Sequence, residues 1–284
     1  MPFENIPAVQ VPLTVEQAEI MEQRQVKKHQ VAVVLVHWFN ALVWLLELTT
    51  GAALLVNPAY RVAPQWYLTM MQDVFGTSAN LLRFHIAVGL TWIAVFLAYA
   101  IFGWRHYLHA EVLRKEVGLD NDDFEWLRIR TLLLVGRTKK HLPPQGAYNA
   151  GQKMYALLVY TMIPVIMITG LIMTFHLLAT AVVAWAMVLH FFAVGMVVSG
   201  LMIHVYMGAV FPEERPAFYS MITGQVNELY AYHHHFKWWR DVRLQQQAWE
   251  RQWAEEEAGN VHGDGATVHS RPVIGAYTLP NEEN

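Results

Sequence analysis

Four long apolar segments constrain the fold of this chain more than any other feature of its sequence. Each is long enough to cross the hydrocarbon core of a bilayer, about 30 Å thick, as an α-helix. Lipid offers no hydrogen-bond partners, so the backbone groups of such segments must be satisfied within helices. Any one segment alone is also compatible with a buried helix of a soluble protein, but four together favour a membrane protein. The sequence therefore predicts an all-α integral membrane fold, a four-helix transmembrane bundle with spans at about residues 31–56, 81–103, 154–178 and 180–211.

Composition agrees with this class and limits the redox chemistry. The chain is 55% hydrophobic and 13% aromatic but only 15% charged, and its net charge of −3 gives no indication of a nucleic-acid partner. Cysteine is absent, so the chain cannot hold an iron–sulphur cluster through thiolates or attach haem covalently through C-x-x-C-H. A redox cofactor would need other ligands, and histidine, with 14 residues, is the abundant candidate.

The basic residues predict the orientation of the spans. Of the 20 Lys and Arg residues, only Arg61 and Arg83 lie on the side that would face outward. The positive-inside rule therefore places both termini and the long middle loop in the cytoplasm. The N-terminus has no apolar core typical of a cleavable signal peptide. We expect a cytoplasmic N-terminal extension over residues 1–26, a four-span domain over 27–243, and a cytoplasmic tail over 244–284. The stretch after Asp241 can begin as a helix, and the tail then loses apolar periodicity and is extended or disordered.

Four histidines in the apolar segments sort into two pairs by depth. His37 lies near the cytoplasmic end of the first span, and His85 opens the second span near the outer side. His190 and His204 are fourteen residues apart on the fourth span, so they share a helix face about 21 Å apart along the axis. With the predicted orientation, His85 and His190 have similar depths on the outer side, as do His37 and His204 on the inner side.

Paired histidines on facing helices are what bis-histidine ligation of a b-type haem requires. A single histidine on an apolar face is more often a hydrogen-bonded core residue than a ligand, but four depth-matched histidines favour two b haems. Gly89, Gly195 and Gly200 would leave room for the macrocycles, although ordinary helix packing also uses glycine. For Glu47 in the first span, a hydrogen bond inside the bundle is favoured over a role in proton transfer. The triplet His233–His235 favours an interfacial patch over a metal site, because consecutive residues do not share a helix face.

Several motifs resemble those of one family. They are "YNAGQKM" at residues 148–154, "VHW" around His37, "GTSANLLRFHIAVG" around His85 and "IHVYMG" around His204. Together they resemble the cytochrome b (gamma) subunit of respiratory membrane-bound formate dehydrogenases over about residues 27–243. The approach to the first candidate ligand, "VAVVLVHW", departs from the family by lacking a charged residue. Contacts to the inner haem's propionates would then come from elsewhere, with Lys27 or Lys28 as candidates.

The resemblance implies an electron-transfer subunit of an oxidoreductase complex in the bacterial cytoplasmic membrane. Electrons would come from an iron–sulphur subunit on the outer side, and a molybdopterin subunit containing molybdenum or tungsten would oxidise formate on another chain. The resemblance also implies that menaquinone is reduced near the inner haem. The residues carried over are Asn149, Gly151 and His204, with Gln152 and Tyr206 as neighbours. The residue chemistry leaves open that Asn149 and Gln152 cap the third span instead.

Two other functions remain open from the sequence. One keeps the haems but changes the complex to a hydrogenase, a thiosulphate reductase or another molybdenum enzyme that exchanges electrons with quinol. The other is a haem-free membrane transporter or scaffold, in which the histidines serve as hydrogen-bonding groups between helices.

Overall fold

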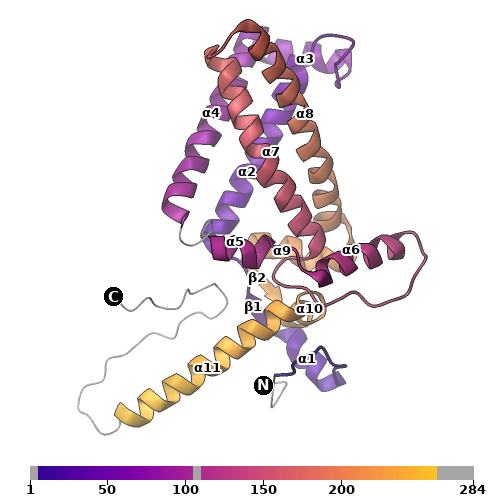
Figure 1. The fold of residues 1–284 in the computed structure, drawn as a ribbon, viewed down its shortest axis with the longest axis vertical. Coiled ribbons are helices and arrows are strands. Elements are labelled where there is room, and N and C mark those ends of the chain that lie inside the picture. The colour runs from indigo at the N-terminus through magenta and orange to yellow at the C-terminus, as the bar shows by residue number, and fades with distance from the viewer. Residues whose placement is uncertain (1–5, 105–109, 261–284) are drawn as a thin grey trace. The chain divides into compact units, whose positions relative to one another are not determined.

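The computed structural model of the chain describes residues 6–104 and 110–260 (Figure 1). Within these residues, four helices are long and apolar enough to cross a membrane, and the last continues through a short π-helical segment to Val210. The prediction of a membrane helical bundle with four spans is confirmed. The four helices are α2 (Val31–Leu54), α4 (Ser78–Gly103), α7 (Ala150–Phe175) and α8 (Thr180–Val205), followed by the π-helix Tyr206–Val210.

Helix α7 begins and ends earlier than the hydropathy predicts. It starts at Ala150, because Asn149 and Gln152 form a reciprocal capping box that satisfies backbone donors at the helix start. Its last residue is Phe175, and His176 follows with a left-handed φ of 49°, a common way to end a helix. Gly151 and Gln152 therefore lie in the first turn of α7, whereas the sequence places them before the span.

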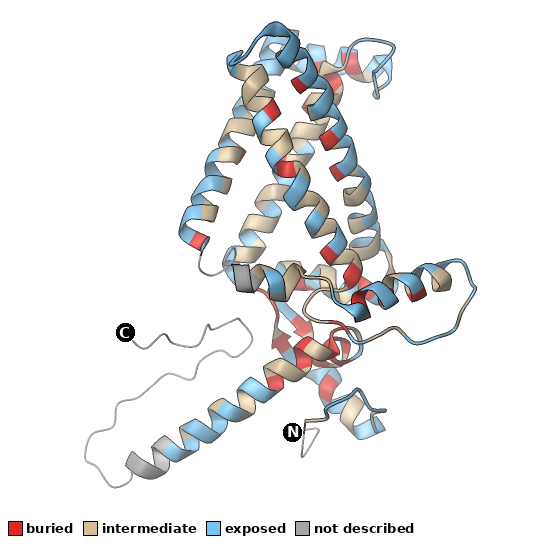
Figure 2. Cartoon of the chain, viewed as in Figure 1, coloured by how far each residue is buried: buried red, intermediate tan, exposed pale blue. Residues whose placement is uncertain are grey.

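The outward surfaces of the four long helices are apolar and exposed. Figure 2 shows long stretches of exposed residues along them, and only 6–17% of each span's most apolar window is buried. Leu45, Phe102 and Trp185 are 61%, 86% and 68% exposed. Surfaces of this kind are stable against lipid, because lipid tails are as apolar as these side chains.

The chain divides into two compact units, of which one comprises residues 32–112 and 158–199. Its central cluster joins Val43 on α2, Trp92 on α4 and Ile163 on α7. The indole nitrogen of Trp92 donates a 2.6 Å hydrogen bond to Oδ1 of Asn40, so the only polar atom of this tryptophan side chain is satisfied in an apolar environment. The short helix α3 (Gln65–Phe75) packs against α4 in the same unit.

The other unit comprises residues up to 31, 113–157 and from 200 onward. Two strands that are far apart in sequence pair antiparallel, with Val26 opposite Val226. This two-stranded sheet, which the sequence does not predict, connects the N-terminal segment to the segment after the fourth span. The elements of this unit outside the long helices are α1 (Val15–Gln23), β1 (Gln25–Lys27), α5 (Ala110–Val117), α6 (Asn121–Leu134), the 3₁₀-helix Pro212–Glu214, α9 (Arg215–Thr223), β2 (Gln225–Asn227), α10 (Glu228–His234) and α11 (Phe236–Asn260).

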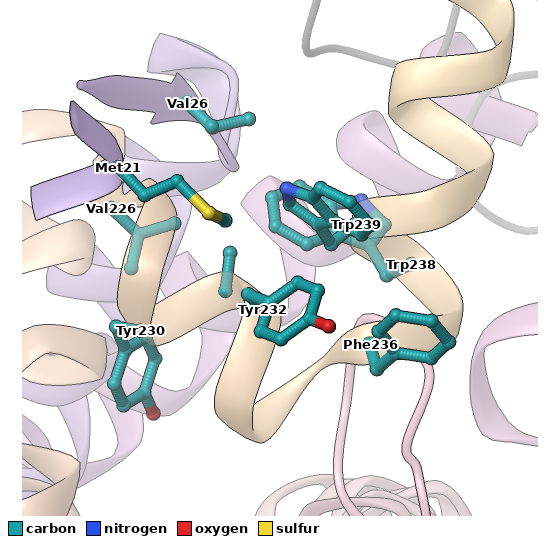
Figure 3. Packing of buried hydrophobic residues seen from close by; sticks show 9 residues of the cluster. Met21, Val26, Val226, Tyr230, Tyr232, Phe236, Trp238 and Trp239 are labelled. Carbon is teal, nitrogen blue, oxygen red and sulfur yellow. The ribbon is translucent and has the colours of Figure 1, made fainter. Parts of the chain in front are cut away.

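A buried aromatic cluster forms the core of this second unit (Figure 3). Tyr232 and Trp239 are 0% and 1% exposed, and their rings meet edge to face with centroids 4.8 Å apart. Met21 from α1, which is fully buried, packs into the same cluster. Large aromatic side chains bury much apolar area for their number, so this cluster is expected to dominate the stability of the unit.

The C-terminal tail begins as a helix, as the sequence allows, and this helix continues through residues that lack apolar periodicity. Helix α11 ends at Asn260. The physical reason for this helix is local. Residues 244–260 are rich in Gln, Glu and Ala, which are good helix formers, and Trp249 and Trp253 contact each other one turn apart. Residues 261–284 lie outside the described residues.

Candidate functional site

The hydrogen bonds of His85 indicate which of its ring nitrogens is available to bind a metal ion. Nδ1 of His85 lies 2.9 Å from Oγ1 of Thr50. The hydroxyl proton of Thr50 is already donated to the carbonyl oxygen of Leu46 at 2.7 Å, so Oγ1 can only accept from the imidazole. Nδ1 therefore carries the proton, and Nε2 keeps the lone pair that an iron ion requires.

His190 has the same arrangement on the other helix pair. Its Nδ1 lies 3.0 Å from Oγ1 of Thr169, whose hydroxyl donates to the carbonyl oxygen of Val165 at 2.6 Å. By the same argument, Nε2 of His190 is unprotonated. His190 and His85 belong to the same unit and are close enough to interact electrostatically.

A glycine follows each of the two threonines and lies against the imidazole. A Cβ atom at Gly51 would come within 3.4 Å of Cε1 of His85, and one at Gly170 within 3.5 Å of Cε1 of His190. Sequence reasoning missed these two Thr-Gly pairs and singled out Gly89, Gly195 and Gly200 instead. A recurring Thr-Gly dipeptide in two different spans was the available signal. Both imidazoles are thus fixed in orientation and tautomer, as the axial ligands of a haem must be.

Glu47 adds a carboxylate to the outer site. Its Oε2 lies 2.6 Å from Nδ1 of His85, whereas Oε1 is buried and makes no hydrogen bond to any described residue. The contact agrees with the expectation of an interior hydrogen bond. Nδ1 has a single proton, so Glu47 and Thr50 compete as its acceptors, and with either acceptor Nε2 stays unprotonated.

The inner candidates lie in separate units. His204 stacks on Tyr155 of α7, with ring centroids 5.2 Å apart and an interplanar angle of 25°. His37 belongs to the other unit, where its ring meets Trp38 edge to face. The pairing of His37 with His204 stays a prediction. Tyr206 is 56% exposed and opens the π-helix after α8.

The quinone-site candidates cluster at the start of α7. Oδ1 of Asn149 accepts from the backbone N–H of Gln152 at 2.9 Å, and Oε1 of Gln152 accepts from the N–H of Asn149 at 2.9 Å. The capping role that the residue chemistry left open is thus present. It uses only Oδ1 of Asn149, and the two N–H donors of its amide take no part in the capping box. Capping and donation to a quinone are therefore compatible at this residue.

Helix α6 is held against this first turn by a buried ion pair. Nζ of Lys153 lies 2.7 Å from Oδ2 of Asp123 and donates to the carbonyl oxygen of Gly118 at 3.1 Å. The side chains of Lys153 and Asp123 are only 7% and 2% exposed. The ring of Trp126 lies 3.7 Å from where a Cβ of Gly151 would be, so glycine allows α6 to approach α7 closely.

The loop before α7 is also fixed by a buried lysine–histidine pair. Nδ1 of His235 lies 2.8 Å from the carbonyl oxygen of Gly146, so Nδ1 is the donor and Nε2 accepts from Nζ of Lys28 at 3.1 Å. Burial lowers the pKa of Lys28 to about 8, against the opposing effect of the charges of Glu214 and Glu116. Burial, and next the charge of Lys28, lower the pKa of His235 well below its usual value.

The stability of the unit that contains Lys28 and His235 should therefore rise with pH. Both groups bind protons more weakly in the folded state, so the unfolded state takes up more protons as the pH falls. We expect stability to fall as the pH drops below about 6.5, where unfolded histidine protonates. Between pH 8 and 10.5, Lys28 is neutral in the folded state but still charged in the unfolded state. The free energy of unfolding should therefore rise by roughly 3 kcal/mol over this range. Thermal unfolding from pH 5 to 10 measures this. His235→Gln should flatten the acid side, whereas the exposed His141→Gln should not.

Comparisons with known proteins identify the family of the chain. Residues 28–224 match the family described as prokaryotic cytochrome b561. The cytochrome b556(fdo) subunit of formate dehydrogenase from Escherichia coli K12 is 25% identical over 211 residues, which cover 73% of this chain and 88% of the relative. The nitrate-inducible cytochrome b556(Fdn) subunit from the same organism is 28% identical over 179 residues, covering 62% and 76%. The formate dehydrogenase cytochrome b556 subunit of Haemophilus influenzae is 22% identical over 247 residues, covering 86% and 93%.

The predicted resemblance to formate dehydrogenase cytochrome b subunits is confirmed by these relatives. The family match spans all four long helices and most of the second unit's elements up to α9. The chain therefore belongs to the prokaryotic cytochrome b561 family of membrane proteins.

Proposed function

We propose that this chain is the cytochrome b subunit of a formate dehydrogenase complex and carries electrons through two b haems to menaquinone. Membership of a cytochrome b family implies b-type haem, and similar proteins are named as formate dehydrogenase subunits. The observation that carries the proposal is the matched environment of His85 and His190, each with a threonine acceptor on Nδ1 and with Nε2 left for iron. A haem-free transporter or scaffold has no need of two imidazoles with the same fixed tautomer.

Four histidines of the chain would form two haem sites. His85 and His190 would hold the outer haem, and His37 and His204 the inner one. Bound haem iron supplies one-electron transfer, which suits relay between a one-electron iron–sulphur donor and a two-electron quinone acceptor. The basic residues support an orientation in a bacterial cytoplasmic membrane with both termini in the cytoplasm. An iron–sulphur subunit and a molybdopterin subunit with molybdenum or tungsten would be the partners on the outer side.

The start of α7 would bind the quinone. The amide of Asn149 can donate to a quinone carbonyl, and Gly151 lies in the same first turn, where it lets Trp126 of α6 approach Asn149 closely. His204 lies nearby through its stacking on Tyr155, one turn along α7 from Gly151. Gln152 holds Asn149 in place through the capping box, and Tyr206 lies two residues beyond His204. Reduction of a quinone carbonyl to a hydroxyl also needs protons, which a cytoplasm-facing site can take from water.

Spectroscopy and haem analysis of the purified complex test this proposal. A reduced-minus-oxidised spectrum should show low-spin b haem, and extraction should give two haems per polypeptide. Formate should reduce both haems when the partner subunits co-purify. Zero or one haem in an intact complex would refute the two-haem assignment. Reduction by hydrogen or by a sulphur compound, but not by formate, would identify a different complex.

Substitutions of Asn149 can separate its two roles. Asn149→Asp and Asn149→Ser keep an oxygen that caps α7, whereas Asn149→Ala removes it. Loss of one hydrogen bond to a neutral ligand costs about 0.5–1.5 kcal/mol, so Asp and Ala should both slow quinone turnover roughly three- to tenfold. Only Ala should also lower thermal stability, by about 0.5–2 kcal/mol.

The measurement is haem reduction by the donor and haem reoxidation by a menaquinone analogue on one preparation. Donor-driven reduction should be normal in all three variants. Normal reoxidation in Asn149→Asp and Asn149→Ser would leave Asn149 with a capping role only.

A further inference from the structure

The guanidinium of Arg130 on α6 is buried but only partly paired. Its Nε and Nη2 atoms are inaccessible to solvent and make no hydrogen bond to any described residue. The whole side chain is 13% exposed. Desolvated cationic donors without acceptors are unfavourable, so this arrangement indicates a ligand that completes it.

The protein groups around Arg130 do not take this role. The guanidinium carbon lies over the rings of Trp126 and Phe211, 5.8 and 4.9 Å from their centroids, and such cation–π contacts replace only part of the lost hydration. Glu213 is 64% exposed and reaches only Nη1, at 3.9 Å. The carboxylate of Glu214 interacts electrostatically with Arg130, but it accepts its hydrogen bond from the hydroxyl of Tyr230 at 2.7 Å, pairs with His234, and makes no hydrogen bond to Nε or Nη2.

The two unpaired atoms define the shape of the missing ligand. Nε and Nη2 lie on the same edge of the planar guanidinium, and their N–H bonds point in parallel. This edge matches the two oxygens of a carboxylate in a bidentate pair.

Arg130 also lies beside the helices that would carry the inner haem. Trp126, one turn before Arg130, contacts the Gly151 position on α7. Tyr155, one turn further along α7, stacks on His204. Phe211, under the guanidinium, follows His204 by seven residues, or about two helical turns. All these residues belong to the same unit of the chain.

We propose that Arg130 binds a propionate carboxylate of the haem ligated by His204, through its Nε and Nη2 atoms. This inference rests on the proposed function, in which His204 is a haem ligand. It replaces Lys28 as the candidate for this contact, because Nζ of Lys28 is buried against Nε2 of His235. Haem propionates lie at the edge of the macrocycle, so an arginine that binds them is expected some distance from the iron ligand, as Arg130 is.

Redox titration of the two haems in the intact complex tests the proposal. A positive charge at a propionate favours the reduced haem, which carries one more negative charge. Arg130→Gln should therefore shift the oxidised-to-reduced equilibrium of one haem about tenfold toward the oxidised form, lowering its potential by about 59 mV. Arg130→Lys keeps the charge but loses the bidentate geometry, so a clearly smaller shift is expected.

Arg128→Gln is the matched control, because Arg128 lies on the same helix, has the same charge and is exposed. It should leave both potentials unchanged, and the outer haem should serve as an internal reference in every variant. Equal potentials in Arg130→Gln and Arg128→Gln, with two haems present, would overturn this inference but not the proposed function. Absence of the second haem from the unmodified complex would instead refute the proposed function. Loss of bound phospholipid from Arg130→Gln at unchanged potentials would assign the site to a lipid phosphate and also overturn it.

Discussion

His190→Ala is expected to remove one of two haems and to stop electron transfer from the partner subunits to quinone. A bis-histidine haem has two protein ligands to its iron, and the substitution removes one of them. The methyl group of alanine cannot bind iron in its place. His85→Ala should have the same effect, because the two imidazoles would bind the same iron. The haem content of the purified complex should fall from two to one per polypeptide, with the inner haem retained.

Thr169→Val and Thr50→Val should weaken haem binding less than loss of the histidine does. Each keeps the ligand but removes the acceptor that orients the Nδ1–H of His190 or His85. Loss of such an outer contact typically weakens metal binding about 10–100-fold, so haem should be retained but lost faster on dilution. His176→Ala is the control, since His176 lies just after the end of α7 and is not among the candidate ligands. A His190→Ala complex that keeps both haem signals would contradict the pairing.

Lys153→Met is expected to have the largest effect on stability. It leaves the carboxylate of Asp123 buried without its cation, and breaking a buried ion pair in this way costs about 3–5 kcal/mol. Because the pair holds α6 against the first turn of α7, quinone turnover should fall together with the melting temperature. Thermal unfolding of the purified complex, with a quinone assay on the same sample, measures both.

Lys237→Met is the matched control for this substitution. Lys237 also pairs with the start of α6, through Asp120 at 2.8 Å and Asp122 at 2.6 Å, but these side chains are 36–53% exposed. Exposed pairs contribute about 0–1 kcal/mol, so this variant should melt close to the unmodified protein. The double variant Asp123→Leu/Lys153→Met should recover part of the loss, because no unpaired charge remains buried. Equal destabilisation by Lys153→Met and Lys237→Met would show that burial of the first pair has no energetic consequence.

The long helices could be predicted from the sequence because hydrophobicity and length alone specify them in lipid. Their ends were less predictable. The first turn of α7 is polar, so hydropathy misses it, and the Asn149–Gln152 capping box that starts it is recognisable only as a local motif. For the opposite reason, the length of α11 was not predicted. This helix has little apolar periodicity and depends on intrinsic propensity and on contacts one turn apart.

The candidate ligands were accessible to sequence reasoning, but their surroundings were not. Depth along a span can be counted in residues, so the similar depths of His85 and His190 could be predicted from the sequence alone, and their binding to one haem stays a prediction. Thr50 and Thr169 act through contacts between helices, and no spacing in the chain indicates which residue of a neighbouring helix meets an imidazole. Arg130 was even less accessible. Its significance depends on two buried atoms without partners, a property of packing rather than of sequence pattern.

The pairing of β1 with β2 has a consequence for the order in which the molecule is made. Val26 must wait for Val226, which the ribosome adds 200 residues later, roughly 10–40 s at about 5–20 residues per second. Met21 and Val26 cannot pack into the aromatic cluster before then, because Tyr232 and Trp239 are synthesised after Val226. The four membrane helices are all synthesised within this interval. A partner that recognises the finished β1–β2 unit would therefore bind only chains whose fourth helix has already left the ribosome.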